Sequence, residues 1–159
     1  TPLHRRLYRK EIVIRGSDIH TFLSDLFQER FNRHQVQLVA TPAFLNTEII
    51  GYPSSFYPVF VNLVDNAVFW LKDKAERVIT LDALSDGTLV VRDTGPGIPL
   101  RDRESIFELG FSRKPGGRGM GLYISREVLR KIDYDLELHP SESGTEFYIR
   151  SQKDKEKDV

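Results

Sequence analysis

Apolar positions recur at helical spacing in the first half of the chain and predict two amphipathic helices. The first follows Ser17, a suitable N-cap, and ends near residues 32–34. Its predicted buried stripe is Ile19, Phe22, Leu23, Leu26, Phe27 and Phe31. The second follows the possible caps Ser54 and Ser55, with Pro58 in its first turn. Its stripe is Phe60, Leu63, Val64, Ala67, Val68 and Leu71.

Short apolar runs between turn residues predict the strands. Residues 78–84 and 88–92 flank Ser85-Asp86-Gly87, which predicts a β-hairpin. A second strand pair encloses a Ser143-Gly144 turn. The strands of this pair and the remaining predicted strands are residues 134–138, 145–150, 12–14, 36–39 and 45–50.

A third helix is predicted over residues 120–131, after a long segment rich in Gly, Pro and charges. The element order is β-α-β-β-α-β-β-loop-α-β-β, which favours hairpins over parallel crossovers. We predict a two-layer α/β (α+β) sandwich, a mixed, largely antiparallel sheet covered on one face by three helices. The segment over residues 94–119 has few apolar anchors, and we expect it to be poorly ordered without its ligand.

One domain over residues 11–150 suits a chain of 159 residues. The basic residues 1–10 are expected to link it to a missing upstream domain, because the chain begins at Thr1. Residues 151–159 are polar and charged, and we expect a disordered tail. No apolar run approaches the roughly 20 residues that span a bilayer, so we expect no direct membrane contact by this domain.

Composition removes several function classes. The 23 Lys and Arg residues balance the 23 Asp and Glu residues, and this lack of a basic excess argues against a nucleic-acid partner. The sequence has no Cys, which excludes disulfides, thiolate zinc sites and a Cys nucleophile.

Two amides mark one face of the second predicted helix. Asn62 and Asn66 are four residues apart and therefore neighbours, although Asn is a mediocre helix former. A solvated face is one interpretation. The other is a site for hydrated Mg²⁺ and phosphates, because Mg²⁺ takes oxygen ligands and keeps several waters.

The segment 93–99 places an acid at a strand end. Asp93 is followed by Gly95 and Gly97, which allow a tight turn and a close backbone approach to a ligand. The carboxylate could accept a hydrogen bond from an exocyclic amine. An ordinary turn with a strand-end Asp is the alternative interpretation.

A glycine-rich segment leads into the third predicted helix. Free N–H groups at a helix start favour anions such as phosphate. The cations Arg113, Lys114 and Arg118 could neutralise phosphate oxygens, although a solvated charge run is the alternative. The pattern is neither a Walker A loop nor a dinucleotide fingerprint.

Taken in order, these motifs resemble the ATP-binding domain of sensor histidine kinases. The matching motifs are Asn62-x-x-x-Asn66, Asp93-x-Gly95-x-Gly97, Phe107-x-x-x-Phe111, Gly117-x-Gly119-x-Gly121-Leu122 and Gly144-Thr145. The resemblance extends over residues 11–150. It implies the Bergerat fold of the GHKL superfamily, which also includes type II topoisomerases and MutL ATPases.

The resemblance implies an adenine site around Asp93, which would bind the adenine amino group. Gly95, Gly97 and Ile98 would shape the wall of this site. Thr145 would assist Asp93 through a water molecule.

The resemblance also implies a phosphate site. Asn66 would hold Mg²⁺, Asn62 would support the phosphates, and Lys114 would contact the γ-phosphate. Further phosphate contacts would come from Arg113, Gly117, Arg118, Gly119, Gly121 and Leu122.

Two positions depart from the family pattern. Hydrolytic members carry a Glu where this chain has Asn62, so the sequence favours phosphotransfer over hydrolysis. Many kinases carry a cation where this chain has Phe69, and Lys72 or Lys74 could substitute for it.

The resemblance implies a protein-histidine kinase that binds Mg²⁺ and ATP and phosphorylates a separate domain. None of the four histidines, His4, His20, His34 and His139, stands in a phospho-acceptor pattern, and we interpret all four as structural or surface residues. The acceptor would lie in an upstream dimerisation domain, which would form a homodimer in the full protein. A response-regulator receiver domain would be a further partner. The domain would be cytoplasmic, either free or as the cytoplasmic part of a membrane-bound receptor. The alternatives are a stand-alone anti-sigma-type serine kinase and a nucleotide-sensing interaction module without catalysis.

Overall fold

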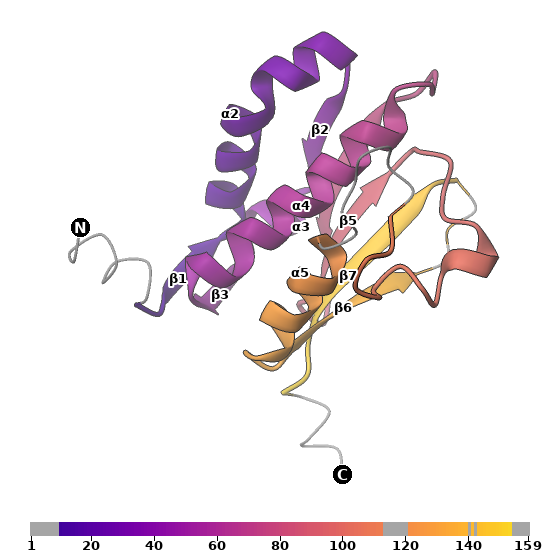
Figure 1. The fold of residues 1–159 in the computed structure, drawn as a ribbon. Coiled ribbons are helices and arrows are strands. Elements are labelled where there is room, and N and C mark those ends of the chain that lie inside the picture. Colours follow the sequence, from indigo (N-terminus) through magenta and orange to yellow (C-terminus); the bar gives the residue numbers. More distant parts are fainter. Residues whose placement is uncertain (1–9, 113–120, 140, 142, 154–159) are drawn as a thin grey trace, which may run out of the picture.

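Helices cover one face of a five-stranded sheet in the computed structural model, which describes residues 10–112, 121–139, 141 and 143–153 (Figure 1). The sheet order is β2 (Gln37–Ala40), β4 (Val78–Ala83), β5 (Leu89–Asp93), β7 (Thr145–Ser151) and β6 (Tyr134–His139). Only β2 and β4 pair in parallel, and the other pairs are antiparallel. The predicted two-layer fold with a largely antiparallel sheet is confirmed. The expected linker and tail lie mostly outside the described residues.

The long helices are α2 (Gly16–His34), α4 (Pro53–Leu71) and α5 (Gly121–Arg130). Helix α4 is the centre of the core, and most of its predicted stripe is fully buried. The predicted stripe of α2 is only partly correct. Phe22 and Leu26 are 40% and 54% exposed, because the buried side of α2 follows Ile19, Leu23, Phe27 and Phe31. Phe22 instead packs its ring edge-on against Tyr57 of α4.

Both helices start earlier than predicted. Helix α2 begins at Gly16, ahead of Ser17, and its first N–H donates to the Thr47 carbonyl at 2.9 Å. Helix α4 begins at Pro53, which occupies the first turn. Pro58 therefore lies inside the helix, where its missing N–H removes one intrahelical bond.

The strand predicted over residues 45–50 is wrong at its beginning. Residues Pro42–Leu45 form the short helix α3, because the Thr41 hydroxyl caps the Phe44 N–H at 3.2 Å and Pro42 follows it. The strand β3 spans Glu48–Gly51 and pairs antiparallel with β1 (Ile12–Arg15). These two strands form a separate ribbon outside the main sheet.

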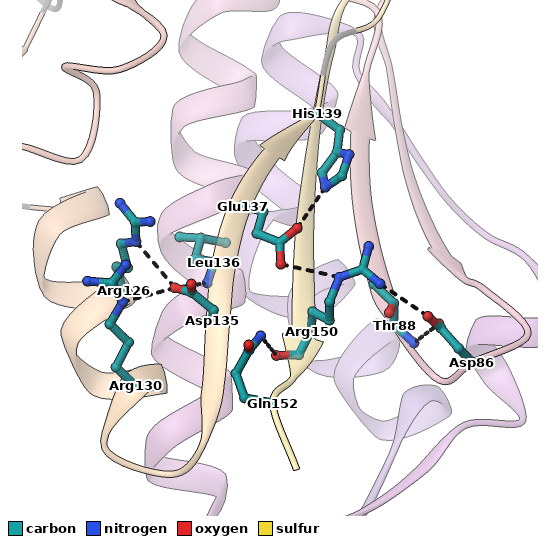
Figure 2. A network of polar contacts seen from close by, with 10 residues as sticks. All are labelled: Asp86, Thr88, Arg126, Arg130, Asp135, Leu136, Glu137, His139, Arg150 and Gln152. Carbon is teal, nitrogen blue, oxygen red and sulfur yellow. Dashed lines mark hydrogen bonds and ion pairs between the residues drawn. The ribbon is translucent and has the colours of Figure 1, made fainter. Parts of the chain in front are cut away.

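The sheet face opposite the helices is polar and carries its own ion pairs (Figure 2). Arg150 of β7 donates to Glu137 of β6 and to Asp86 of the β4–β5 turn, both at 3.2 Å. His139 bonds Glu137 at 2.9 Å and stacks on Tyr148 at 3.7 Å between ring centroids. These contacts pair the charged side chains of this partly exposed face with one another. Within the described ranges, no helix combines the length and apolarity needed to cross a membrane.

Candidate functional site

A cleft of about 760 Å³ opens between α4, the segment after β5, the start of α5 and β7. The predicted site residues that line it are Asn62, Asn66, Asp93, Gly97, Ile98, Gly121, Leu122 and Thr145. Eight positions from four separate stretches of the chain therefore meet in one cavity. Gly95 is buried beside it, and its backbone N–H donates to Asp93.

One end of the cleft is organised around the carboxylate of Asp93, at the end of β5. The residue stands opposite Thr145 in the β5–β7 register. Its Oδ1 accepts a hydrogen bond from the Gly95 N–H at 2.8 Å, and the Thr145 N–H also bonds the carboxylate. Burial raises the pKa of Asp93 to about 6, and the two N–H donors oppose that rise only partly. The site therefore holds a desolvated acceptor ready for a donor from a ligand.

The turn before β7 brings two backbones together at this end. Gly144 has φ +136° and lies directly against the backbone carbonyl of Asp93. Gly97 has φ +78°, and a Cβ there would stand 3.1 Å from the Gly144 carbonyl oxygen. Only glycine fits at residue 144, and a side chain at residue 97 would be strained by its positive φ and by this tight contact.

We predict that Asp93 makes the protein less stable as pH rises from about 4 to 6. The group binds its proton more tightly when folded, with a pKa of about 6, than when unfolded, where the pKa is 3.8. Deprotonation therefore costs more in the folded state, by about 2 to 3 kcal/mol for a shift of this size. The free energy of unfolding in urea should therefore rise by that amount for Asp93→Asn relative to the wild type between pH 4 and pH 7. A difference independent of pH would contradict the prediction.

The opposite end of the cleft combines the amides of α4 with the first residue of α5. The Asn62 Nδ2 donates to the buried Ser125 Oγ at 3.3 Å, and its Oδ1 lies against Gly121. A side chain at residue 121 would collide with that amide. The beginning of α5, with its partial positive charge, therefore faces the cleft beside Asn62.

Asn66 has an amide oxygen that could bind a cation. Its half-buried side chain lines the cleft and has no hydrogen-bond partner among the described residues. Among the residues that the structure describes, no group of three or more His, Asp and Glu side chains is placed to hold a metal ion. These residues fit Mg²⁺ only if phosphates and water supply the other ligands.

Some predicted contacts do not reach the cleft. Lys72 lies 4.7 Å over the ring of Phe69, and neither Lys72 nor Lys74 is among the lining residues. The cations Arg113, Lys114 and Arg118 and the glycines 117 and 119 lie outside the described residues.

The long segment is better anchored than its sequence suggested. Residues Leu100–Asp102 form a 3₁₀ helix, and Ile106 is only 4% exposed. Phe107 and Phe111 pack against the core. The expectation of few apolar anchors is therefore wrong for residues 94–112, because Ile106 is buried and the two Phe side chains pack on the core. Order that depends on the ligand stays a prediction.

Sequence reasoning missed several lining residues. The most prominent is Trp70, which lies beside Gly95 at the Asp93 end and is 41% exposed. It stands four residues after Asn66 on the same face of α4, a spacing that could have indicated it. Arg101 and Arg103 also line the cleft, and no motif pointed to them.

The described histidines take no part in this cleft. His20, His34 and His139 are absent from its lining. His34 ends α2, where burial and the nearby Lys72 and three arginines lower its pKa. The interpretation of these three residues as structural or surface groups agrees with their positions.

Residues 51–155 match the profile of the family described as histidine kinase-, DNA gyrase B- and HSP90-like ATPase. The chain is 30% identical to the signal transduction histidine-protein kinase BarA of Escherichia coli K12 over 118 residues, 67% of this chain and 13% of BarA. It is 32% identical to the histidine-protein kinase/phosphatase MprB of Mycobacterium tuberculosis over 123 residues, 73% of this chain and 24% of MprB. The chain thus covers less than a quarter of the length of these relatives.

Solved structures show the same fold. The catalytic domain of the histidine kinase ThkA in a nucleotide-free form superposes with a TM-score of 0.75 at 22% identity, over 88% of this chain and 93% of that one. Full-length ShkA in complex with AMPPNP superposes with a TM-score of 0.73 at 19% identity, over 90% of this chain and 31% of that one.

Proposed function

Because this chain belongs to the family of histidine kinase-, DNA gyrase B- and HSP90-like ATPases, we propose that its cleft binds ATP together with Mg²⁺. We infer further that the domain presents the γ-phosphate to a histidine on a separate dimerisation domain, as the catalytic part of a cytoplasmic two-component sensor kinase. A receiver domain of a response regulator would then take the phosphate. The observation that carries this proposal is the desolvated Asp93 carboxylate, which faces the cleft across from the amides of α4.

The Asp93 end suits adenine in shape and in hydrogen bonding. An adenine amino group is a donor, and Asp93 presents an ionised acceptor at neutral pH. The apolar side chains of Ile98 and Trp70 line the same cleft and suit a flat ring. A guanine would bring a carbonyl oxygen toward Asp93 instead, so the pocket should prefer adenine.

The other end suits phosphates. The start of α5 favours an anion, and Asn66 can share Mg²⁺ with phosphate oxygens. The amide of Asn62 has no basic oxygen to activate a water molecule, which supports transfer rather than hydrolysis.

The position of the histidines supports an acceptor in another domain. The described histidines do not line the cleft, so a phosphate bound there would not reach them without a rearrangement. Positioning and charge neutralisation would supply the rate, as in other phosphoryl transfers. No specific observation favours the serine kinase or the interaction module.

Fluorescence of Trp70, the single tryptophan of the chain, tests nucleotide binding directly. We expect a non-hydrolysable ATP analogue to change the emission in a saturable manner, more tightly with Mg²⁺ than without it. Asn66→Ala should remove most of the Mg²⁺ effect and weaken binding about tenfold, because a ligand to the cation is lost. Titration of both proteins with and without Mg²⁺ measures this.

Asn32→Ala is the matched control, since Asn32 also lies on a helix but outside the cleft. It should bind like the wild type. A folded wild type that binds no analogue would contradict the proposed function. A wild type that binds equally well without Mg²⁺ would contradict the role of Asn66 alone.

A further inference from the structure

Arg126 of α5 makes two contacts that hold separate segments together. Its guanidinium carbon lies 4.3 Å from the centroid of the Phe107 ring, within the range of a cation–π interaction. Its Nε also donates to Asp135 Oδ1 at 3.2 Å, where β6 begins (Figure 2). Neither Arg126 nor Phe107 lines the cleft, so any effect of this contact on a ligand must act through other residues.

The contact with Phe107 joins two segments that line the cleft. Phe107 belongs to the segment that supplies Ile106 and Phe111 to the lining. Helix α5 supplies Gly121 and Leu122 to the lining. Phe107 is itself held against Phe147 of β7, edge-to-face with 6.4 Å between ring centroids. Arg126 therefore connects the segment after β5, through Phe107, with the helix whose start faces the phosphate end.

We propose that Arg126 is a positioning residue that fixes the start of α5 for the phosphates of the nucleotide. The proposal rests on the proposed function. The adenine end does not depend on this contact, because Asp93 is held by its own turn and by the β5–β7 ladder. Loss of Arg126 should therefore weaken contacts to phosphates and leave contacts to adenine unchanged.

Arg130 provides a matched comparison on the same helix. It donates to the same oxygen, Asp135 Oδ1, at 3.1 Å, and it is more exposed than Arg126. The cation–π contact with Phe107 is formed by Arg126. Comparing Arg126→Ala with Arg130→Ala thus separates the contact with Phe107 from the ion pair with β6.

The test measures the affinity of the complete chain for a non-hydrolysable Mg·ATP analogue and for adenosine, both by Trp70 fluorescence. Arg126→Ala should lower the affinity for the analogue about tenfold, because small displacements of positioning groups have large effects. Its affinity for adenosine should stay within about twofold of the wild type. Arg130→Ala should bind both ligands within about twofold of the wild type, because exposed ion pairs contribute little to stability. Arg126→Lys, which keeps a cation over the ring, should recover most of the loss.

Phe107→Leu keeps an apolar side chain and removes the aromatic face. It should match Arg126→Ala, and the double variant should be no weaker than either single one. Equal losses for the analogue and for adenosine would overturn the proposal, as would equal losses in Arg126→Ala and Arg130→Ala. A wild type that binds neither ligand would instead overturn the proposed function.

Discussion

Asp93→Asn should lower the affinity for an ATP analogue about 100-fold, because hydrogen bonds to charged groups contribute about 1.5 to 3 kcal/mol. In the variant, the amide oxygen should take the place of Oδ1, because the Gly95 N–H donates a hydrogen bond there. The new –NH₂ group would then take the place of the other carboxylate oxygen. A donor would then stand where an adenine amino group needs an acceptor. Calorimetric titration at pH 7 measures the loss.

The same variant should be as stable as the wild type at pH 7, or more stable, because it removes a buried charge. Lost binding together with kept or raised stability distinguishes a binding role from a structural one. A variant that binds like the wild type would contradict the assignment of Asp93 to the adenine site.

Asp82→Asn is the matched control on the neighbouring strand β4. Burial disfavours the charge of Asp82, but hydrogen bonds from Thr41, Ala83 and Arg92 outweigh it and hold the pKa below its ordinary value. This carboxylate therefore stabilises the fold when ionised, and it lies outside the cleft. Its replacement should reduce stability at pH 7 and leave nucleotide affinity unchanged, the reverse of Asp93→Asn.

Gly144→Ala should destabilise the fold by about 3 to 5 kcal/mol, combining backbone strain with a steric collision. The residue has φ +136°, which side chains rarely adopt, and a Cβ there would collide with the Asp93 carbonyl. Relief of the collision would separate β7 from β5 beside Thr145 and disturb the donors around Asp93. We therefore expect nucleotide binding to be lost as well. Urea unfolding and Trp70 fluorescence measure the two effects.

Gly87→Ala isolates the strain from the collision. Gly87 has φ +90°, but a Cβ there would meet nothing within 4 Å. Its replacement should cost only about 1 kcal/mol and leave binding intact, because the turn lies outside the cleft. If the two glycine variants were equally destabilised, the close approach at Gly144 would not be the cause.

Local sequence patterns predicted much of the fold and several residues of the candidate site. The paired strands around Gly87 and around Gly144 follow from turn chemistry, which acts over a few residues. The spacing of Asn62 and Asn66 placed both amides on one helix face, and both line the cleft. The sequence mispredicted the helix starts, because Pro42 and Pro53 begin α3 and α4. It also predicted Phe22 and Leu26 to be buried, although packing against neighbouring helices decides which side of α2 is buried.

The sequence by itself determined the class of fold and the order of its elements apart from α3, because these depend on periodicity and short spacing. Its resemblance to kinase ATP-binding domains also indicated several of the residues that line the cleft. Only the tertiary structure decided the rest. The β5–β7 register set Asp93 against Thr145 and raised its pKa, since burial depends on residues distant in sequence. Packing of α5 likewise brought Arg126 onto Phe107 and Ser125 onto Asn62. No local pattern encodes such contacts, because they join segments that are separated by 19 and 63 positions along the chain.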